Sequence, residues 1–110
     1  YKGVVHQERD GLHVSLDSQA LFGKAKATEA VEKEGLPLLR AAADLVKRKY
    51  TGVPLRVEAY AGGKTLAERQ AQAVESYMEK ELMIQGQDIT SDALAVPYAE
   101  QRLELILVNR

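Results

Sequence analysis

The chain has 110 residues, of which 45% are hydrophobic and 28% are charged. That length suits one domain with one hydrophobic core, and the composition is typical of a globular protein rather than a disordered one. The 15 basic and 16 acidic residues are mixed along the chain and give a formal net charge of −1. We expect no nucleic-acid partner, because binding phosphates needs a broad basic face.

Cysteine is absent, which excludes disulfides and thiolate metal sites and leaves the compartment open. No run approaches the ~20 apolar residues of a membrane span, so we expect no membrane contact by this domain itself. The sequence opens at Tyr1 without a Met or a signal-like segment. We therefore expect residues 1–110 to be a single domain excised from a longer protein.

The first expected elements are two strands joined by the turn Arg9-Asp10-Gly11. Apolar and polar residues alternate over residues 12–17, which indicates one buried and one wetter face. His13 falls on the wetter face and is expected to be partly exposed. Residues 18–34 are less regular, although their Ala- and Glu-rich second half favours a helix.

Helical spacing of apolar residues begins at Pro37 and predicts a helix that Thr51-Gly52 ends. Alternation over residues 54–61 predicts a strand, which Gly62-Gly63 interrupts. Thr65 is then expected to cap a second helix in a capping box with Glu68.

Gly86 is the expected end of that second helix. Residues 89–96 favour a short strand that Pro97 breaks. Residues 103–108 are apolar on both faces, which is typical of a strand in the middle of a sheet. The order βαβαββ predicts an α/β (α+β) two-layer sandwich with two main helices on one face of a mixed sheet.

Catalytic and cofactor sites are not expected. Gly63-Lys64-Thr65 follows a strand and precedes a helix, but the Gly that a phosphate-binding loop needs five positions earlier is Glu58. A tight turn into a capped helix explains this string, although backbone amides there remain able to hold a carboxylate. No serine lies in a nucleophile elbow, and the acidic residues are scattered. The chain is expected to be a binding domain and not an enzyme.

A metal site is not expected either. His6 and His13 flank the first turn and are expected to approach each other across a hairpin. Two histidines without a matching carboxylate make a poor metal site, so both are interpreted as surface strand residues.

The expected binding edge is the strand–loop–helix segment over residues 60–70. Tyr60 lies on the polar face of its strand, at the end that leads into the loop. Two roles stay open for it, lining a shallow cleft or packing across strands.

Five segments, taken in order, resemble the OmpA-like domain found in OmpA, Pal and MotB proteins. The segments are residues 11–16 with 21–22, 36–39, 55–60, 66–74 and 101–105. Residues 66–74 are similar to the family's "LSxxRAxxV" helix, and residues 101–105 to its "RRVEI" strand. This resemblance implies a periplasmic domain that anchors envelope proteins to peptidoglycan without catalysis.

The resemblance also implies a ligand, the diaminopimelate of the stem peptide. The family holds it with an Asp in a "TDxxG" loop and the Arg of "LSxxRA", since a zwitterion needs a carboxylate and a guanidinium. Here Gly62 occupies the Asp position and Gln70 the Arg position, in a shortened loop. Arg69 stands one residue early, about 100° around the helix. Arg102 matches an arginine of the closing strand motif.

Two hypotheses follow from these departures. The favoured one is a protein-interaction or assembly module of an envelope complex, because exchanging a charge-assisted contact for a neutral amide gives up about 1–3 kcal/mol. The alternative is a peptidoglycan-binding anchor with a rearranged site. The candidate ligand-binding residues are Tyr60, Gly62, Gly63, Lys64, Thr65, Arg69, Gln70 and Arg102.

Overall fold

A five-stranded sheet forms one layer of the protein, in a computed structural model that describes residues 3–23, 31–49, 54–83 and 88–108. Its strand order is β1-β2-β5-β3-β4. β3 pairs with β4 in parallel, and the other described pairings are antiparallel. The strands are β1 (Gly3–Glu8), β2 (Gly11–Asp17), β3 (Leu55–Ala61), β4 (Ile89–Ala95) and β5 (Arg102–Val108). The central place of β5 confirms the prediction from its two-sided apolar pattern.

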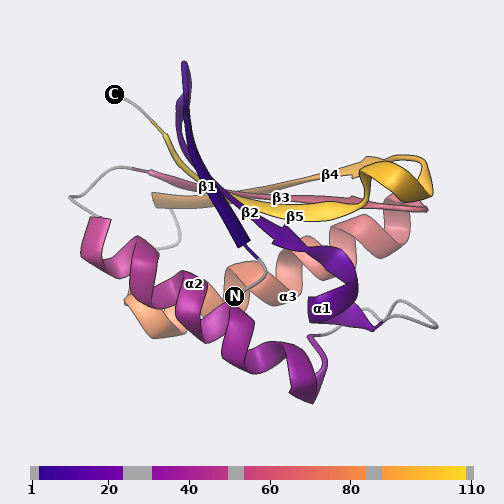
Figure 1. The fold of residues 1–110 in the computed structure, drawn as a ribbon, viewed down its shortest axis with the longest axis horizontal. Coiled ribbons are helices and arrows are strands. Elements are labelled where there is room, and N and C mark those ends of the chain that lie inside the picture. Colours follow the sequence, from indigo (N-terminus) through magenta and orange to yellow (C-terminus); the bar gives the residue numbers. More distant parts are fainter. Residues whose placement is uncertain (1–2, 24–30, 50–53, 84–87, 109–110) are drawn as a thin grey trace.

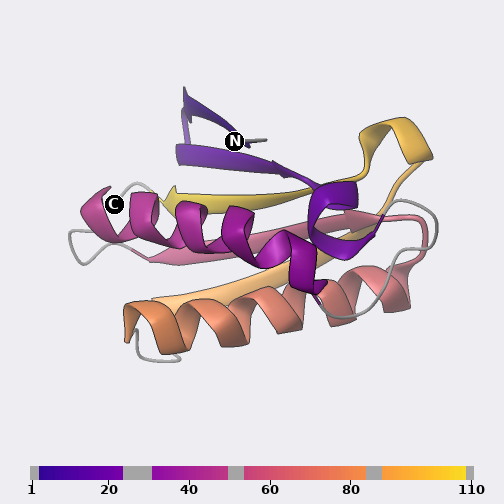
Figure 2. The same ribbon diagram turned by 60° about the horizontal axis from the view of Figure 1, so that its bottom comes forward.

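The second layer consists of α2 (Leu36–Lys49) and α3 (Lys64–Leu82), which lie side by side against one face of the sheet (Figures 1 and 2). This confirms the predicted two-layer α+β sandwich. The short helix α1 (Ser18–Phe22) and the 3-10 turn η1 (Lys33–Gly35) fall in the segment without a clear pattern. Most of the helix favoured in the second half of that segment lies outside the described residues.

The core lies between the sheet and the helices. β2, β3 and β5 bury alternate residues on the helix side, and the stripes of α2 and α3 meet them. Buried members include Val14, Leu16, Leu39, Val46, Leu55, Val57, Ala67, Val74, Met78, Leu103 and Leu105. The periods of two and of about 3.6 residues thus place these apolar side chains as predicted.

The ends of α3 differ from the prediction. The helix begins at Lys64 with Gly63 as its N-cap and no side-chain cap hydrogen bond from the described residues. The capping box of Thr65 and Glu68 is therefore wrong, because Thr65 already lies inside the first turn. Leu82 ends the helix and Met83 adopts a left-handed conformation with φ 54°. Gly86 and Thr51-Gly52 lie outside the described residues.

Gly11 allows β5 to pass close to the start of β2. Its φ is +150°, and a Cβ there would lie 2.0 Å from the carbonyl oxygen of Leu107. Any side chain would therefore push β5 away.

The short helix α1 has a side-chain cap. The Asp17 carboxylate accepts from the backbone N–H of Gln19 at 3.0 Å and caps α1.

The face of the sheet opposite the helices has no layer of described helices over it, and we call it the open face. The β1–β2 hairpin bends toward this side (Figure 1). Among the described helices, none is long and apolar enough to cross a membrane. The alternation of side chains directs the polar residues of β2, β3 and β5 to the open face.

Candidate functional site

The expected binding edge has the predicted strand, turn and helix. β3 ends at Ala61 and α3 begins at Lys64, so only Gly62 and Gly63 connect them. A Cβ on Gly62 would lie 3.3 Å from the side-chain nitrogen of Gln101, whereas one on Gly63 would meet no described atom within 4 Å. The turn is short, and it offers a ligand only its backbone groups.

Tyr60 packs across strands, which is one of the two roles left open for it. The guanidinium carbon of Arg102 lies 3.9 Å from the centre of the Tyr60 ring, a cation–π contact between register partners of β3 and β5. The Tyr60 hydroxyl donates to Glu58 Oε1 at 2.6 Å. Burial, together with this hydrogen bond, raises the pKa of Tyr60 well above its usual value.

Gln70, one of the candidate residues of α3, does not lie beside Tyr60. Gln70 is 1% exposed and belongs to the buried stripe with Ala67 and Ala71, whereas Arg69 is exposed. Because α3 covers the other face of the sheet, Gln70 is separated by that sheet from Tyr60 and Arg102. The eight candidate residues therefore do not converge on one site.

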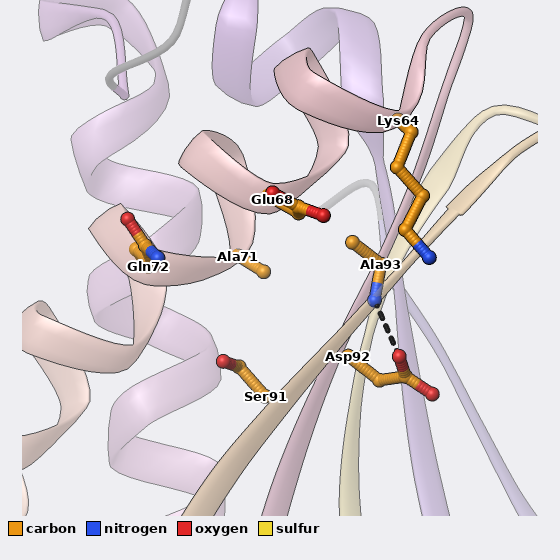
Figure 3. A pocket seen from close by; sticks show the side chains of 7 residues that line it. All are labelled: Lys64, Glu68, Ala71, Gln72, Ser91, Asp92 and Ala93. Carbon is orange, nitrogen blue, oxygen red and sulfur yellow. Dashed lines mark hydrogen bonds between the residues drawn. The ribbon is translucent and has the colours of Figure 1, made fainter.

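A shallow pocket of about 200 Å³ lies between α3 and the edge strand β4 (Figure 3). It presents a lysine and two carboxylates, and the Asp92 carboxylate accepts from the N–H of Ala93 at 2.8 Å. Lys64 is the only candidate residue among its lining residues, which are Lys64, Glu68, Ala71, Gln72, Ser91, Asp92 and Ala93. Sequence reasoning missed Asp92, because only the packing of α3 against β4 brings it beside Lys64.

Two buried glutamates face each other on the open face. Glu58 and Glu104 are register partners in β3 and β5, and they are 7% and 6% exposed. Like charges directly opposite destabilise a sheet, but each carboxylate has an arginine. Arg56 Nη2 lies 2.8 Å from Glu58 Oε2, and Arg102 Nε lies 3.3 Å from Glu104 Oε2.

His13 is 9% exposed, so the prediction of a partly exposed histidine is wrong. Its Nε2 lies 2.7 Å from Asp10 Oδ1, and its Nδ1 lies 3.2 Å from Glu104 Oε1. Burial opposes a charged ring, but the hydrogen bonds to these carboxylates outweigh it and raise the pKa of His13.

Glu104 is the carboxylate that the histidine pair lacked in the sequence. Ser15 donates to its Oε1 at 2.9 Å. Burial opposes its ionisation, but the hydrogen bonds from Ser15 and His13 prevail and lower the pKa of Glu104. The reason for expecting no metal site at the histidines therefore fails.

His6 stacks on His13 across the β1–β2 hairpin, as predicted. The ring centroids are 5.3 Å apart, and the planes are inclined by 24°. One potential ligand atom from each of His6, His13 and Glu104 lies within 4.8 Å of the other two. We call these three residues the histidine–glutamate cluster.

Comparisons with known proteins give structural neighbours only. No family model matches the sequence, and no curated protein matches it. The cell wall anchor of the T6SS from Pseudomonas aeruginosa superposes with a TM-score of 0.80 at 17% identity, covering 98% of this chain and 89% of that one.

Two further neighbours agree with this result. The periplasmic domain of Helicobacter pylori MotB has a TM-score of 0.79 at 15% identity and covers 97% of this chain and 79% of that one. The OmpA-like domain of FopA1 from Francisella tularensis has a TM-score of 0.65 at 19% identity and covers 94% and 77%. This chain therefore has the fold of the OmpA-like and MotB periplasmic domains, with a strongly diverged sequence.

Proposed function

We propose that this chain is a non-enzymatic, periplasmic OmpA-like domain of a cell-envelope protein and acts as an interaction or assembly module. Its fold is shared with a protein described as a cell wall anchor and with MotB periplasmic domains. The observation that carries the proposal is the burial of Gln70, which is 1% exposed at the position where the resemblance expects a ligand-binding arginine.

The chemistry of a zwitterionic ligand supports this proposal. Its ammonium needs a carboxylate and its carboxylate needs a guanidinium. Gly62 offers no side chain, and the Gln70 amide is neutral and buried. Each lost charge-assisted contact costs about 1–3 kcal/mol, which is roughly tenfold or more in affinity. A partner protein is therefore favoured over the stem peptide.

The alternative is a peptidoglycan-binding anchor that uses the pocket between α3 and β4. Lys64 offers an ammonium, and Glu68 and Asp92 offer carboxylates within that pocket. An amino acid needs such groups of both signs. In this alternative, Tyr60 and Arg102 stabilise the sheet and do not touch the ligand.

Two measurements distinguish the assembly module from the peptidoglycan-binding anchor: retention on purified sacculi, and a diaminopimelate titration followed by NMR. The assembly module predicts no retention and no saturable shifts. The anchor predicts saturable shifts at Lys64 and Asp92 and loss of retention in Lys64→Gln. Arg40→Gln is the matched control, because Arg40 is an exposed helical cation on α2 away from the pocket.

A restoration experiment tests the same proposal from the other direction. The double variant Gly62→Asp with Gln70→Arg returns both charges that the resemblance assigns to ligand binding. If the missing charges are the reason for lost recognition, this variant gains retention on sacculi that Gly62→Asn with Gln70→Lys does not match. Strong retention of the unmodified chain would contradict the assembly-module proposal.

A further inference from the structure

We propose that the histidine–glutamate cluster is a binding site for one divalent transition-metal ion of the zinc class. The site lies on the open face and joins β1, β2 and β5. It shares no residue with the pocket between α3 and β4 or with the β3–α3 turn, so it goes beyond the proposed function. Two imidazoles and one carboxylate are a ligand set that zinc accepts.

Strand register brings the three side chains together. His6 and His13 are register partners in β1 and β2, and Ser15 is the register partner of Glu104 in β5. Glu104 is therefore the diagonal neighbour of His13, within reach of a long side chain. With bonds of about 2.1 Å at a tetrahedral angle, two ligand atoms of one zinc ion lie roughly 3.4 Å apart. The 3.2 Å between His13 Nδ1 and Glu104 Oε1 is close to that separation.

Neighbouring groups already orient His13 and Glu104, the two buried ligands of the proposed site. The Asp10 carboxylate lies 2.7 Å from His13 Nε2 and holds the proton there, which leaves Nδ1 to face Glu104. A histidine ligand that donates its other N–H to a carboxylate is the usual arrangement around protein-bound zinc. Ser15 and Arg102 fix the Glu104 carboxylate from its other sides.

The space between His13 Nδ1 and Glu104 Oε1 suits a cation. Both ring nitrogens face carboxylate oxygens, and a neutral imidazole carries only one proton. Without metal, one proton therefore lies between Nδ1 and Oε1, on the ring or on the carboxyl group. A divalent ion takes the place of that proton, releases it to solvent, and binds both His13 and Glu104.

His6 completes the site by turning its ring. The His6 side chain is 39% exposed, and its Nε2 lies 3.3 Å from Glu8 Oε1. An exposed pair of this kind contributes little to stability, so little is lost when the ring turns. Because a metal binds in the plane of an imidazole ring, the present stacking of His6 on His13 must open. Water fills the remaining coordination position, as in zinc sites with three protein ligands.

Calorimetric titration of the 110-residue chain with Zn²⁺ tests the proposal. We expect one ion per chain, with proton release and with NMR shifts confined to the cluster and its neighbours. Mg²⁺ should not compete, because it prefers oxygen ligands. Asp10→Asn should weaken affinity by roughly 10–100-fold, the usual cost of losing an outer partner, and His6→Gln and Glu104→Gln by more.

Glu8→Gln is the matched control, since Glu8 contacts His6 but does not belong to the cluster. It should leave Zn²⁺ affinity unchanged or slightly higher. If Glu104→Gln fails to fold, His6→Gln still decides, because His6 lies on the edge strand. The absence of one-to-one Zn²⁺ binding, or an unchanged Zn²⁺ affinity in His6→Gln, would overturn the proposed metal site. Loss of binding in Glu8→Gln would also overturn the site, because the ion would then sit on the exposed His6–Glu8 pair.

Discussion

The two faces of the sheet differ in what they bury: the helix face buries apolar side chains, and the open face buries charged side chains as well as Ile106. On the helix face, β5 places Leu103, Leu105 and Leu107 into an apolar core. On the open face, the same strand places Glu104 at 6% exposure among arginine, histidine and serine. Neighbouring residues of one strand therefore depend on different forces.

This difference indicates which kind of change destabilises each face. Apolar burial is non-directional and scales with the area removed from water. A buried carboxylate is stable only while its hydrogen-bonding partners are present. The helix face should therefore respond to lost volume, and the open face to lost partners, pH and ions.

Leu105→Ala should lower the free energy of unfolding by about 3–5 kcal/mol, because it removes a fully buried side chain and leaves a cavity. Urea denaturation measures this loss. The effect should change little with salt concentration, since no charge is involved. A loss below 1 kcal/mol would mean that the helix face does not carry the main core.

Glu104→Ala, one position earlier on the opposite face, should cost about 2–3 kcal/mol, because His13, Ser15 and Arg102 lose their shared acceptor. Glu104→Gln keeps the shape and should cost less. Urea denaturation at low and high salt distinguishes this residue from Leu105. A cost of Glu104→Ala that stays the same at low and high salt would argue against a role of the charge.

Tyr60→Phe should cost about 1 kcal/mol, because it removes the hydrogen bond to Glu58 and keeps the ring beneath Arg102. Thermal unfolding measures the change. Tyr60→Leu, which also removes the aromatic ring, should cost more. If both variants cost the same, the cation–π contact adds nothing to stability.

The smallest effect concerns pH in metal-free protein kept in chelator. The raised pKa of His13 gives stability that is present below its ordinary value of 6.5 and is lost as pH rises through its folded value. The lowered pKa of Glu104 gives stability that is present above 4.5 and is lost as pH falls through its folded value. The contribution of this pair should therefore be largest between those two values.

The groups that face His13 in that experiment are Asp10 in the turn, His6 on β1, and Glu104 with Arg102 on β5. Denaturation at several pH values should show the maximum, and His13→Gln should flatten its alkaline side. A profile identical in His13→Gln would mean that other groups set the pH dependence.

The local pattern of apolar and polar residues was enough to predict most of the strands and helices. Alternation over residues 12–17, the helical stripe from Pro37 and the apolar run at 103–108 each predicted the observed element. Helix ends were less predictable: Gly63 and not Thr65 caps α3, since a glycine-rich turn lets a helix start without a side-chain cap.

The candidate site was predictable in its segment and not in its contacts. Residues 60–70 form the expected strand, turn and helix, but the sheet separates Tyr60 from Gln70. Asp92 reaches the pocket of Lys64 only because β4 pairs in parallel beside β3.

The sequence by itself determined which apolar residues of the main strands and helices point into the core, because side-chain direction repeats with the local period of each element. Only the tertiary structure decided which polar residues meet. His13 and Glu104 are 91 positions apart, and they became neighbours because β5 inserts between β2 and β3. Strand order is a property of the whole sheet, so the carboxylate that completes the histidine pair was visible only in the folded chain.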